Sequence, residues 1–318
     1  MVENFPFLNT DRPVLVLGAA GMDVVGRLEA ELRPAASNPA RIRSSYGGVA
    51  RNVAENLARL GQPARLVTVL GNDRIGNEIL EHTASAGVDV SAVLQTSDYP
   101  TGFYMGIVDR SGKLQFAVDD MRLLEEITPY YLQEQEALFK ASCLAFVDAN
   151  LPVKTLRAAV NLARRARIPI CADTAAFTLA ERLVKFLPEF YLVTANSKEA
   201  GALTGLSFEA VDRHAAMEAA RMLVNRGVRI ALVTLAEYGV VYATSETTVH
   251  IPAIRTRISD PTGAGDAMTA AVLFALLNDI ELDDAIRLGV SAASLTLRHP
   301  GSVFPDLTLE ALYDQLLV

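Results

Sequence analysis

The chain has 318 residues, of which 51% are hydrophobic and 21% charged, and its formal net charge is −8. This composition is too apolar for a disordered chain, and the acidic balance argues against a protein that binds a nucleic-acid polymer through a basic stripe. The length allows one large domain or two small ones. We therefore expect small molecules as partners.

Three features bear on the compartment. Cys143 and Cys171 lie inside apolar runs, which is typical of buried thiols in a reducing compartment. The first residues, Met-Val-Glu-Asn-Phe-Pro, carry an acid where a secretory signal has Lys or Arg. The longest apolar run, residues 267–277, is about half of the ~20 residues that span a bilayer, so we expect a core helix. Together these features predict a cytoplasmic protein without a membrane partner.

Short apolar runs alternate with amphipathic segments along the chain. We expect strands at residues 14–18, 65–71, 144–147, 169–172, 191–194 and 230–235, and helices at 52–60, 76–86, 153–167, near 179–186, from 197, and at 215–226. Strands rich in Val, Ile and Leu that are separated by single helices indicate a mostly parallel sheet with helices on both faces. Both halves show this pattern and no linker divides them, so we expect a single α/β domain over residues 1–318.

Two segments depart from this pattern, residues 24–50 and 98–121, because they alternate in polarity like half-exposed strands. We expect them to form a small inserted β-sheet beside the main one, used as a lid over a ligand. An antiparallel extension of the main sheet is the alternative.

Polar residues follow several of the expected strands. In an open α/β sheet, ligands bind outside the carboxyl ends of the strands. Together, Asp23, Asp148, Asn150, Asp173, Asn196 and Glu199 predict a polar cleft along one sheet edge, in which we expect Asp23, Asn150 and Asp173 to bind the substrate. Because Asp and Asn are favoured at helix N-caps, capping is the alternative interpretation of each.

The most informative string is Ser-Asp-Pro-Thr-Gly-Ala-Gly-Asp at residues 259–266, directly before the long apolar run. Gly263, Ala264 and Gly265 leave backbone N–H groups open to a close ligand, and the positive end of a helix points at the same place. An acid at an anion site is explained if Asp266 accepts a proton from a hydroxyl that attacks a phosphate. A tight turn with Asp266 as N-cap is the alternative. The spacing fits neither a P-loop nor a dinucleotide fingerprint.

A second string, residues 46–61, places paired glycines before a helix. The backbone at Gly47 and Gly48 is suited to lie against a sugar, and Asn52 to bind sugar hydroxyls. The same sequence is also compatible with a hairpin turn followed by a helix N-cap, which is the alternative interpretation. The four histidines lack zinc-type spacing, so a metal is expected only as magnesium bound through phosphates and one acid, for which Glu199 is best placed.

These two strings, in this order, resemble the signatures of the ribokinase-like (phosphofructokinase B) family of sugar and nucleoside kinases, and the resemblance covers nearly the whole chain. It implies a doubly wound α/β sheet with a small β-lid that often builds a homodimer, and ATP and Mg²⁺ as cofactors. By position, it makes Asp266 the catalytic base and the N–H groups of residues 263–266 the anion hole. It assigns sugar contacts to Asp23, Gly48 and Asn52, nucleotide contacts to Asn196, Thr234, Gly239 and Thr262, magnesium to Glu199, and the K⁺ site of some relatives to Asp260.

Within the family, the stretch from Ser37 to Ile42 looks like that of pseudouridine kinases. This likeness implies that Ser37 and Asn38 lie in the lid against the nucleoside base. An ordinary Asn-Pro turn is the alternative interpretation of the same residues. We therefore expect ATP-dependent phosphorylation of the 5′-hydroxyl of a nucleoside, pseudouridine first. Another acceptor (ribose, fructose phosphate, adenosine or uridine) and a non-catalytic nucleoside-binding module are the alternatives.

Overall fold

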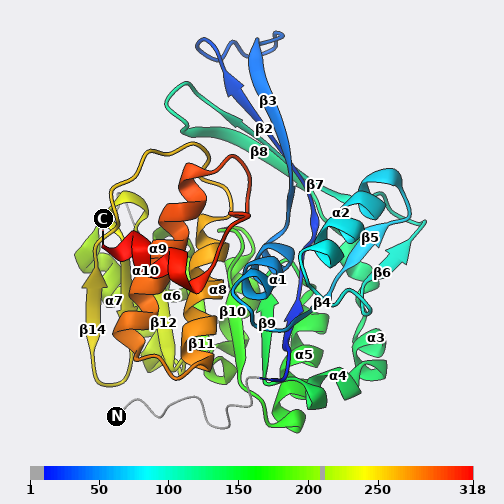
Figure 1. Ribbon diagram of the computed structural model, residues 1–318, viewed down its shortest axis with the longest axis vertical. Helices are drawn as coiled ribbons and strands as arrows, with labels where there is room; N and C mark the ends of the chain where they lie inside the picture. The colour runs from blue at the N-terminus through cyan, green and yellow to red at the C-terminus, as the bar shows by residue number, and fades with distance from the viewer. Residues whose placement is uncertain (1–10, 208–211, 318) are drawn as a thin grey trace.

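The computed structural model describes residues 11–207 and 212–317, and its centre is an eight-stranded sheet in the order β14-β13-β12-β11-β10-β9-β1-β4 (Figure 1). Its strands are β1 (Val14–Leu17), β4 (Ala64–Val67), β9 (Leu144–Asp148), β10 (Ile170–Asp173), β11 (Leu192–Asn196), β12 (Ile230–Thr234), β13 (Val240–Ala243) and β14 (Thr248–Ile251). Neighbours from β4 to β12 are parallel, which confirms the expected sheet. The antiparallel edge formed by β13 and β14 was not expected.

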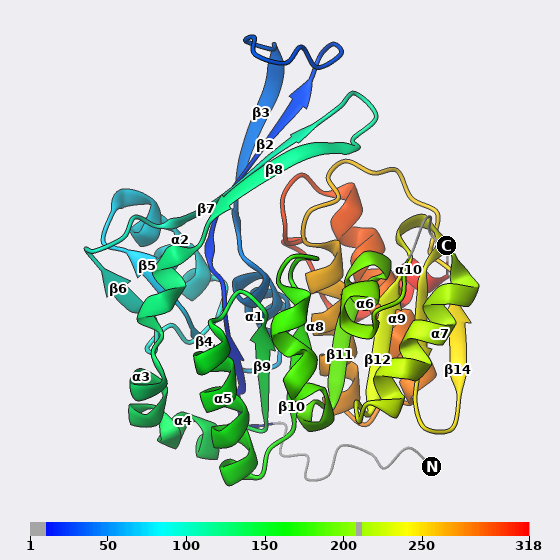
Figure 2. The same ribbon diagram turned by 180° about the vertical axis from the view of Figure 1, so that it is seen from behind.

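Helices cover both faces of this sheet, as predicted (Figure 1, Figure 2). One face carries α1 (Val49–Arg59), α8 (Ala264–Leu277), α9 (Leu282–Arg298) and α10 (Leu309–Leu316). The other carries α3 (Pro129–Glu134), α4 (Glu136–Ala141), α5 (Val153–Ala166), α6 (Ser197–Thr204) and α7 (Arg213–Asn225). In β1, Val14 and Val16 join the core beneath α1 and α8, whereas Leu15 and Leu17 join the core beneath α5. Because both faces of the strand are buried, its sequence is continuously apolar.

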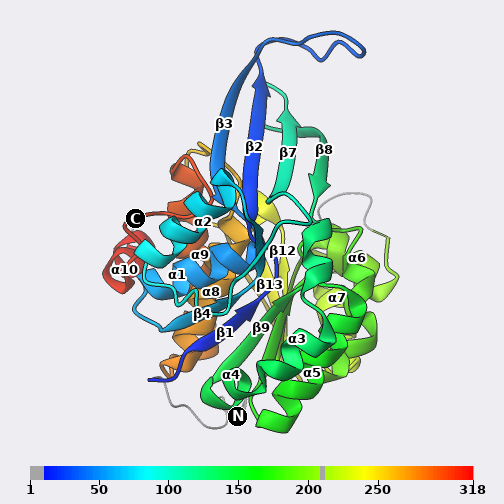
Figure 3. The same ribbon diagram turned by 90° about the vertical axis from the view of Figure 1, so that its right-hand side faces the viewer.

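A separate four-stranded sheet stands away from the main one in the order β3-β2-β7-β8 and is called the small sheet here (Figure 3). Its strands are β2 (Gly21–Leu28), β3 (Ala40–Gly47), β7 (Gly102–Val108) and β8 (Leu114–Asp120). The predicted inserted sheet is thus confirmed, and the alternative of an extension of the main sheet is wrong. Its first strand begins earlier than expected, since β2 follows β1 almost directly and β3 leads straight into α1.

Smaller differences from the expected elements have local causes. The single strand expected at residues 65–71 is divided into β4 and β5 (Val69–Gly71), and β5 pairs with β6 (Leu94–Thr96) beside α2 (Arg74–Ser85). The helix expected near 179–186 is the 3₁₀ segment η2 (Ala180–Glu189), which contains Pro188. Pro188 lacks a backbone N–H, so an α-helix could not continue through this end of the segment. Two further 3₁₀ turns are η1 (Arg122–Glu126) and η3 (Ala236–Tyr238).

The long apolar run forms the inner part of α8, and residues 267–277 are all buried, as expected of a core helix. Among the described residues, no helix is both long and apolar enough to cross a membrane. Cys143 and Cys171 are buried and free, as predicted. Burial raises the pKa of the Cys143 thiol to about 11, so this thiol stays protonated near neutral pH.

Candidate active site

A cavity of about 1020 Å³ opens at the carboxyl edge of the main sheet, beneath the small sheet. It lies beside β1 and β9, which are neighbours although the chain leaves β1 toward β4 and leaves β9 toward β10. Such a reversal of strand order is where open α/β sheets bind ligands. The small sheet contributes Asp23 and Tyr104, α1 contributes Asn52, and α8 contributes Asp266 to the wall.

Asp148, at the end of β9, holds the chain segments of this crevice together. Its fully buried carboxylate accepts N–H bonds from Ala19 at 2.8 Å, Ala50 at 3.1 Å and Asn150 at 2.9 Å. A Cβ at Gly18 would lie 2.1 Å from Asp148 Oδ2, so only glycine lets the loop after β1 approach this closely. Asp148 therefore joins the loop after β1 to the start of α1.

The head of α8 forms the floor, and Gly263 is its N-cap in a left-handed conformation with φ 77°. A Cβ at Gly263 would lie 1.8 Å from the carbonyl oxygen of Ser302, whereas one at Gly265 would meet nothing within 4 Å. The first N–H groups of a helix have no partners within it, so this open turn is suited to receive an anion. Asp266 lies inside the first turn, and the alternative that it is the N-cap is wrong.

Asp266 is bonded to Asn52 across the floor. The Nδ2 group of Asn52 donates to Asp266 Oδ2 at 2.6 Å. Burial, with the negative charges of Asp148 and Glu199, raises the pKa of Asp266 to about 6, although the Asn52 bond and Arg51 lower it. A carboxylate with this pKa is ionised at neutral pH and is basic enough to accept a proton.

Asp23 lies on the cavity wall, beside the paired glycines. A Cβ at Gly47 would lie 2.1 Å from Asp23 Oδ2, and one at Gly48, where φ is 92°, would lie 2.4 Å from the carbonyl oxygen of Ala19. Burial raises the pKa of Asp23 to about 7, and Asp266 contributes to the increase while Arg51 opposes it. Gly48 lines the cavity, and Gly47 allows Asp23 to pack against the end of β3.

A second acidic group follows β10 and β11. The buried Glu199 carboxylate accepts bonds from the Thr174 hydroxyl at 2.6 Å and the Asn196 N–H at 2.8 Å. The Asn196 side chain accepts from the Glu199 N–H in return, so the capping interpretation of Asn196 is confirmed. Burial, with Asp266 and Glu199, raises the pKa of Asp173 well above its usual value.

The carboxylates of Asp173, Glu199 and Asp266 raise one another's energy by charge repulsion, which a bound cation would relieve. Because their donor atoms are all oxygens, the cation that they suit is Mg²⁺. Within the described ranges, however, no group of three His, Cys, Asp or Glu side chains is arranged to hold a metal alone. A magnesium ion bound beside these carboxylates would therefore take most of its ligands from phosphate and water.

The residues assigned to the nucleotide lie along the same edge. Asn196 and Thr234 are register partners on β11 and β12, but neither lines the cavity. Gly239 follows η3 with φ 102°, and a Cβ there would lie 2.1 Å from the carbonyl oxygen of Ile251. Thr262 and Asp260 do line the cavity, and the Thr262 N–H donates to Asp260 at 2.9 Å.

The residues assigned to the acceptor are distributed unequally. Asn150 lines the cavity, whereas Asp173 does not. Ser37 and Asn38 lie in the connection between β2 and β3, outside the cavity lining. The Asn38 side chain bonds to the backbone of Arg33 and Ala36, which closes a local turn. The role of Ser37 and Asn38 against a base stays a prediction.

Sequence reasoning overlooked Arg51 and Glu55, which are almost fully buried on α1. The signal was present, because Arg51 and Glu55, like Asn52 and Asn56, are spaced i,i+4 on a helix with an apolar stripe at Val53 and Leu57. This spacing places the four polar side chains next to the apolar stripe on the helix surface, where they can be buried together with it. Tyr104 and the cavity-facing arginines of the small sheet were also missed, because alternation in a strand does not show which face meets a ligand.

Known proteins match this chain over nearly its whole length. Residues 11–309 match the model of the pfkB family carbohydrate kinases. A guanosine-inosine kinase of Exiguobacterium acetylicum is 31% identical over 94% of this chain and 99% of its own length. A pseudouridine kinase of Escherichia coli is 28% identical over 93% of this chain and 94% of its own length. A solved structure described as a ribokinase II of E. coli, in complex with ATP and Mg²⁺, has a TM-score of 0.82 at 16% identity and covers 96% of this chain and 99% of its own. With nearly its whole length matched, the chain belongs to the pfkB family of carbohydrate kinases.

Proposed function

We propose that this phosphotransferase transfers the γ-phosphoryl group of ATP to the 5′-hydroxyl of a ribosyl nucleoside, with pseudouridine as the first choice. The observation that carries the proposal is the pair formed by Asp266 and Asn52 at the head of α8, on the floor of a cavity of about 1020 Å³. A cavity of this size is at the upper end of those that bury small ligands, and it can hold a nucleoside with part of a nucleotide.

In the proposed reaction, the chain positions the reactants and stabilises charge. Asp23, Gly48 and Asn52 hold the ribose, and all three line the cavity. Asp266 accepts the proton of the attacking hydroxyl. The N–H groups at the head of α8 stabilise negative charge on the transferred phosphoryl group.

ATP and Mg²⁺ are supported by the complex recorded for the E. coli ribokinase II and by the acidic group around Glu199. A bound magnesium ion would neutralise charge on the phosphates. Glu199 would orient it, through water or directly, and Asn196, Thr234, Gly239 and Thr262 are proposed to contact the nucleotide. A potassium ion at Asp260 remains a proposal, and replacing K⁺ by tetramethylammonium in the assay tests it.

Two nucleoside classes compete as acceptor. Pseudouridine is supported by the E. coli relative and by the Ser37-Asn38 stretch, and a purine nucleoside by the Exiguobacterium relative. An ADP-release assay over pseudouridine, uridine, guanosine, inosine, adenosine, ribose and fructose 6-phosphate separates them. The highest kcat/KM with pseudouridine supports the first choice, and the highest with inosine or guanosine replaces it. Thermal stabilisation by a nucleoside without any ADP release would instead support a non-catalytic binding module.

The small sheet is proposed to act as a lid over the cavity. It is also proposed to be the contact surface of a homodimer. The protein itself is proposed to act in the cytoplasm. Its outer face, turned away from the cavity, carries large apolar side chains that are exposed in the single chain: Ile42 (72%), Met105 (45%), Phe116 (50%) and Val118 (59%). A contiguous apolar patch of this kind marks an interaction surface in a monomer.

A further inference from the structure

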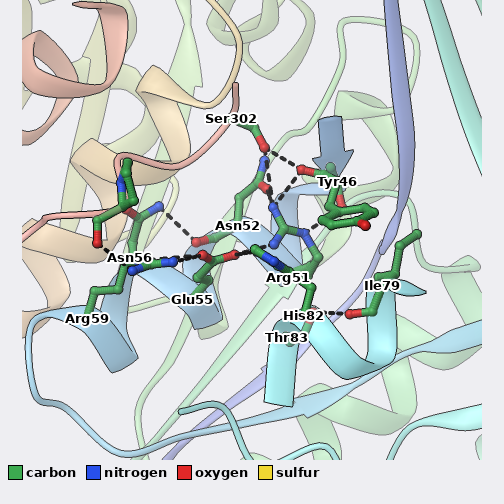
Figure 4. Close-up of polar contacts among 12 residues, drawn as sticks. Tyr46, Arg51, Asn52, Glu55, Asn56, Arg59, Ile79, His82, Thr83 and Ser302 are labelled. Carbon is green, nitrogen blue, oxygen red and sulfur yellow. Dashed lines mark hydrogen bonds and ion pairs between the residues drawn. The ribbon is translucent and has the colours of Figure 1, made fainter. Parts of the chain in front are cut away.

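A buried guanidinium lies directly behind the proposed active site. Arg51 is 1% exposed, and Figure 4 shows its side chain among polar groups of α1 and β3 and the segment around Ser302. Its acceptors are the carbonyl oxygens of Gly47 (3.0 Å) and Tyr46 (2.7 Å), the Ser302 hydroxyl (3.3 Å), the Glu55 carboxylate and Asn52 Oδ1. The guanidinium is therefore fixed on every side.

The bond between Arg51 and Asn52 determines which way the Asn52 amide faces. A guanidinium only donates hydrogen bonds, so the amide oxygen must face Arg51. The NH₂ group must then face Asp266, to which it donates at 2.6 Å. Without Arg51, the amide oxygen loses its donor, and the bond to Asp266 alone no longer fixes the position of the Asn52 side chain.

Glu55 keeps Arg51 in place. Its carboxylate, almost fully buried, also binds Arg59, with Nε at 2.9 Å, and His82, with Nε2 at 3.3 Å. Burial alone would raise the pKa of Glu55, but His82, Arg51 and Arg59 together lower it to about 2. Glu55 is thus ionised at neutral pH and neutralises the charge of the buried guanidinium.

Arg51 does not itself line the acceptor cavity, whereas Asn52 and Asp266 do. With Glu55 it lines a second cavity of about 620 Å³, behind the small sheet. The polar atoms of Arg51 are bonded to protein groups, so this second cavity offers no unpartnered guanidinium to a ligand.

We propose that Arg51 is a positioning residue, which orients the Asn52 amide so that Asp266 accepts its hydrogen bond and stays aligned with the acceptor hydroxyl. The proposal rests on the role of Asp266 in the proposed function. It deepens that role, because it extends the active site to a residue that never touches substrate.

A double-mutant cycle tests the proposal on the full chain. We measure kcat/KM for the wild type, Arg51→Met, Asn52→Ala and the double variant, with thermal unfolding of each. Misalignment of a reacting group costs on the order of 100-fold, so each single change is expected to lose about that much. If Arg51 acts through Asn52, the double variant loses little more than Asn52→Ala alone. If the two losses multiply, the proposal is overturned.

A matched control is Arg59→Met, which removes another partner of Glu55 without touching Asn52. Its effect is expected to be small, and it should multiply with that of Asn52→Ala. Should Arg51→Met fail to fold, Arg51→Lys is used in the same cycle, since it keeps the buried charge but not the planar fork. The variant Asp266→Asn separates the two hypotheses. If it stays active, the proposed function fails. If it is inactive but the losses in kcat/KM of Arg51→Met and Asn52→Ala multiply, only the positioning role fails.

Discussion

The Asn52 amide donates a 2.6 Å hydrogen bond to the Asp266 carboxylate, which joins residues 214 positions apart in the sequence. Each residue heads a helix that lies against the other, α1 against α8. The bond therefore joins the group proposed to bind the acceptor to the group proposed to activate it.

The first prediction concerns Asp266. The substitution Asp266→Asn removes the proton acceptor and should lower kcat by about 10²–10⁴-fold, as expected for a general base. Steady-state ADP release measures the loss, and calorimetric titration should show that ATP and nucleoside still bind. The control is Asp284→Asn, at an exposed carboxylate in the first turn of α9. Near wild-type kcat in Asp266→Asn would exclude Asp266 as base.

The second prediction is a pH dependence. Because the pKa of Asp266 is raised to about 6, its carboxylate becomes protonated as the pH falls through that value and can no longer accept a proton. We expect kcat/KM to decline below about pH 6. Protonation of Asp23, whose pKa is raised to about 7, adds to the decline, so we expect a plateau only above about pH 8. A pH series with circular dichroism at each point checks that the fold persists. A flat profile from pH 5 to 8 would contradict the assignment.

The third prediction compares two glycines. Gly263 and Gly61 have similar positive φ values, 77° and 89°, but a Cβ meets the Ser302 backbone at the first and nothing at the second. The substitution Gly61→Ala should cost only the left-handed strain, about 1 kcal/mol of unfolding free energy. The substitution Gly263→Ala adds a clash and should cost about 3 kcal/mol.

Urea unfolding measures both losses, and ADP release measures activity. Only Gly263→Ala should reduce kcat, because it displaces the head of α8. Equal losses of stability in the two variants would show that the Ser302 segment moves aside freely.

The fourth prediction concerns the outer face of the small sheet. A charge in Val118→Lys should prevent the proposed homodimer from forming, which light scattering coupled to size exclusion detects as a halved mass. Tyr313→Lys is the control, since Tyr313 is 47% exposed on α10, away from the small sheet. A wild-type chain that is monomeric at micromolar concentration would contradict the dimer proposal.

Much of the fold was accessible from sequence because strands buried on both faces, such as β1, are continuously apolar and stand apart from amphipathic helices. The edge strands β13 and β14 were missed, since a short antiparallel hairpin lacks the helix that marks each parallel crossover. The position of Asp266 at a helix head followed from its Gly-rich turn.

Its bond to Asn52 could not be predicted, because the pairing depends on how α1 packs against α8. The burial of Arg51 was hidden for a different reason. A charged residue on a helix is usually solvated. This one is enclosed because its i,i+4 partner Glu55 neutralises its charge and the carbonyl oxygens of Tyr46 and Gly47 accept its remaining hydrogen bonds.

The small sheet is continuous with the crevice beneath it. β2 starts at Gly21, two residues before Asp23, and β3 ends at Gly47, immediately before Gly48 and α1. The two strands are thus connected directly to the crevice, so a tilt of the small sheet would displace Asp23 and the head of α1 together. If the small sheet tilts in this way, ligand binding in the crevice and contact at the outer face of the sheet would be thermodynamically linked, and a partner bound at that face would change the affinity for the proposed acceptor.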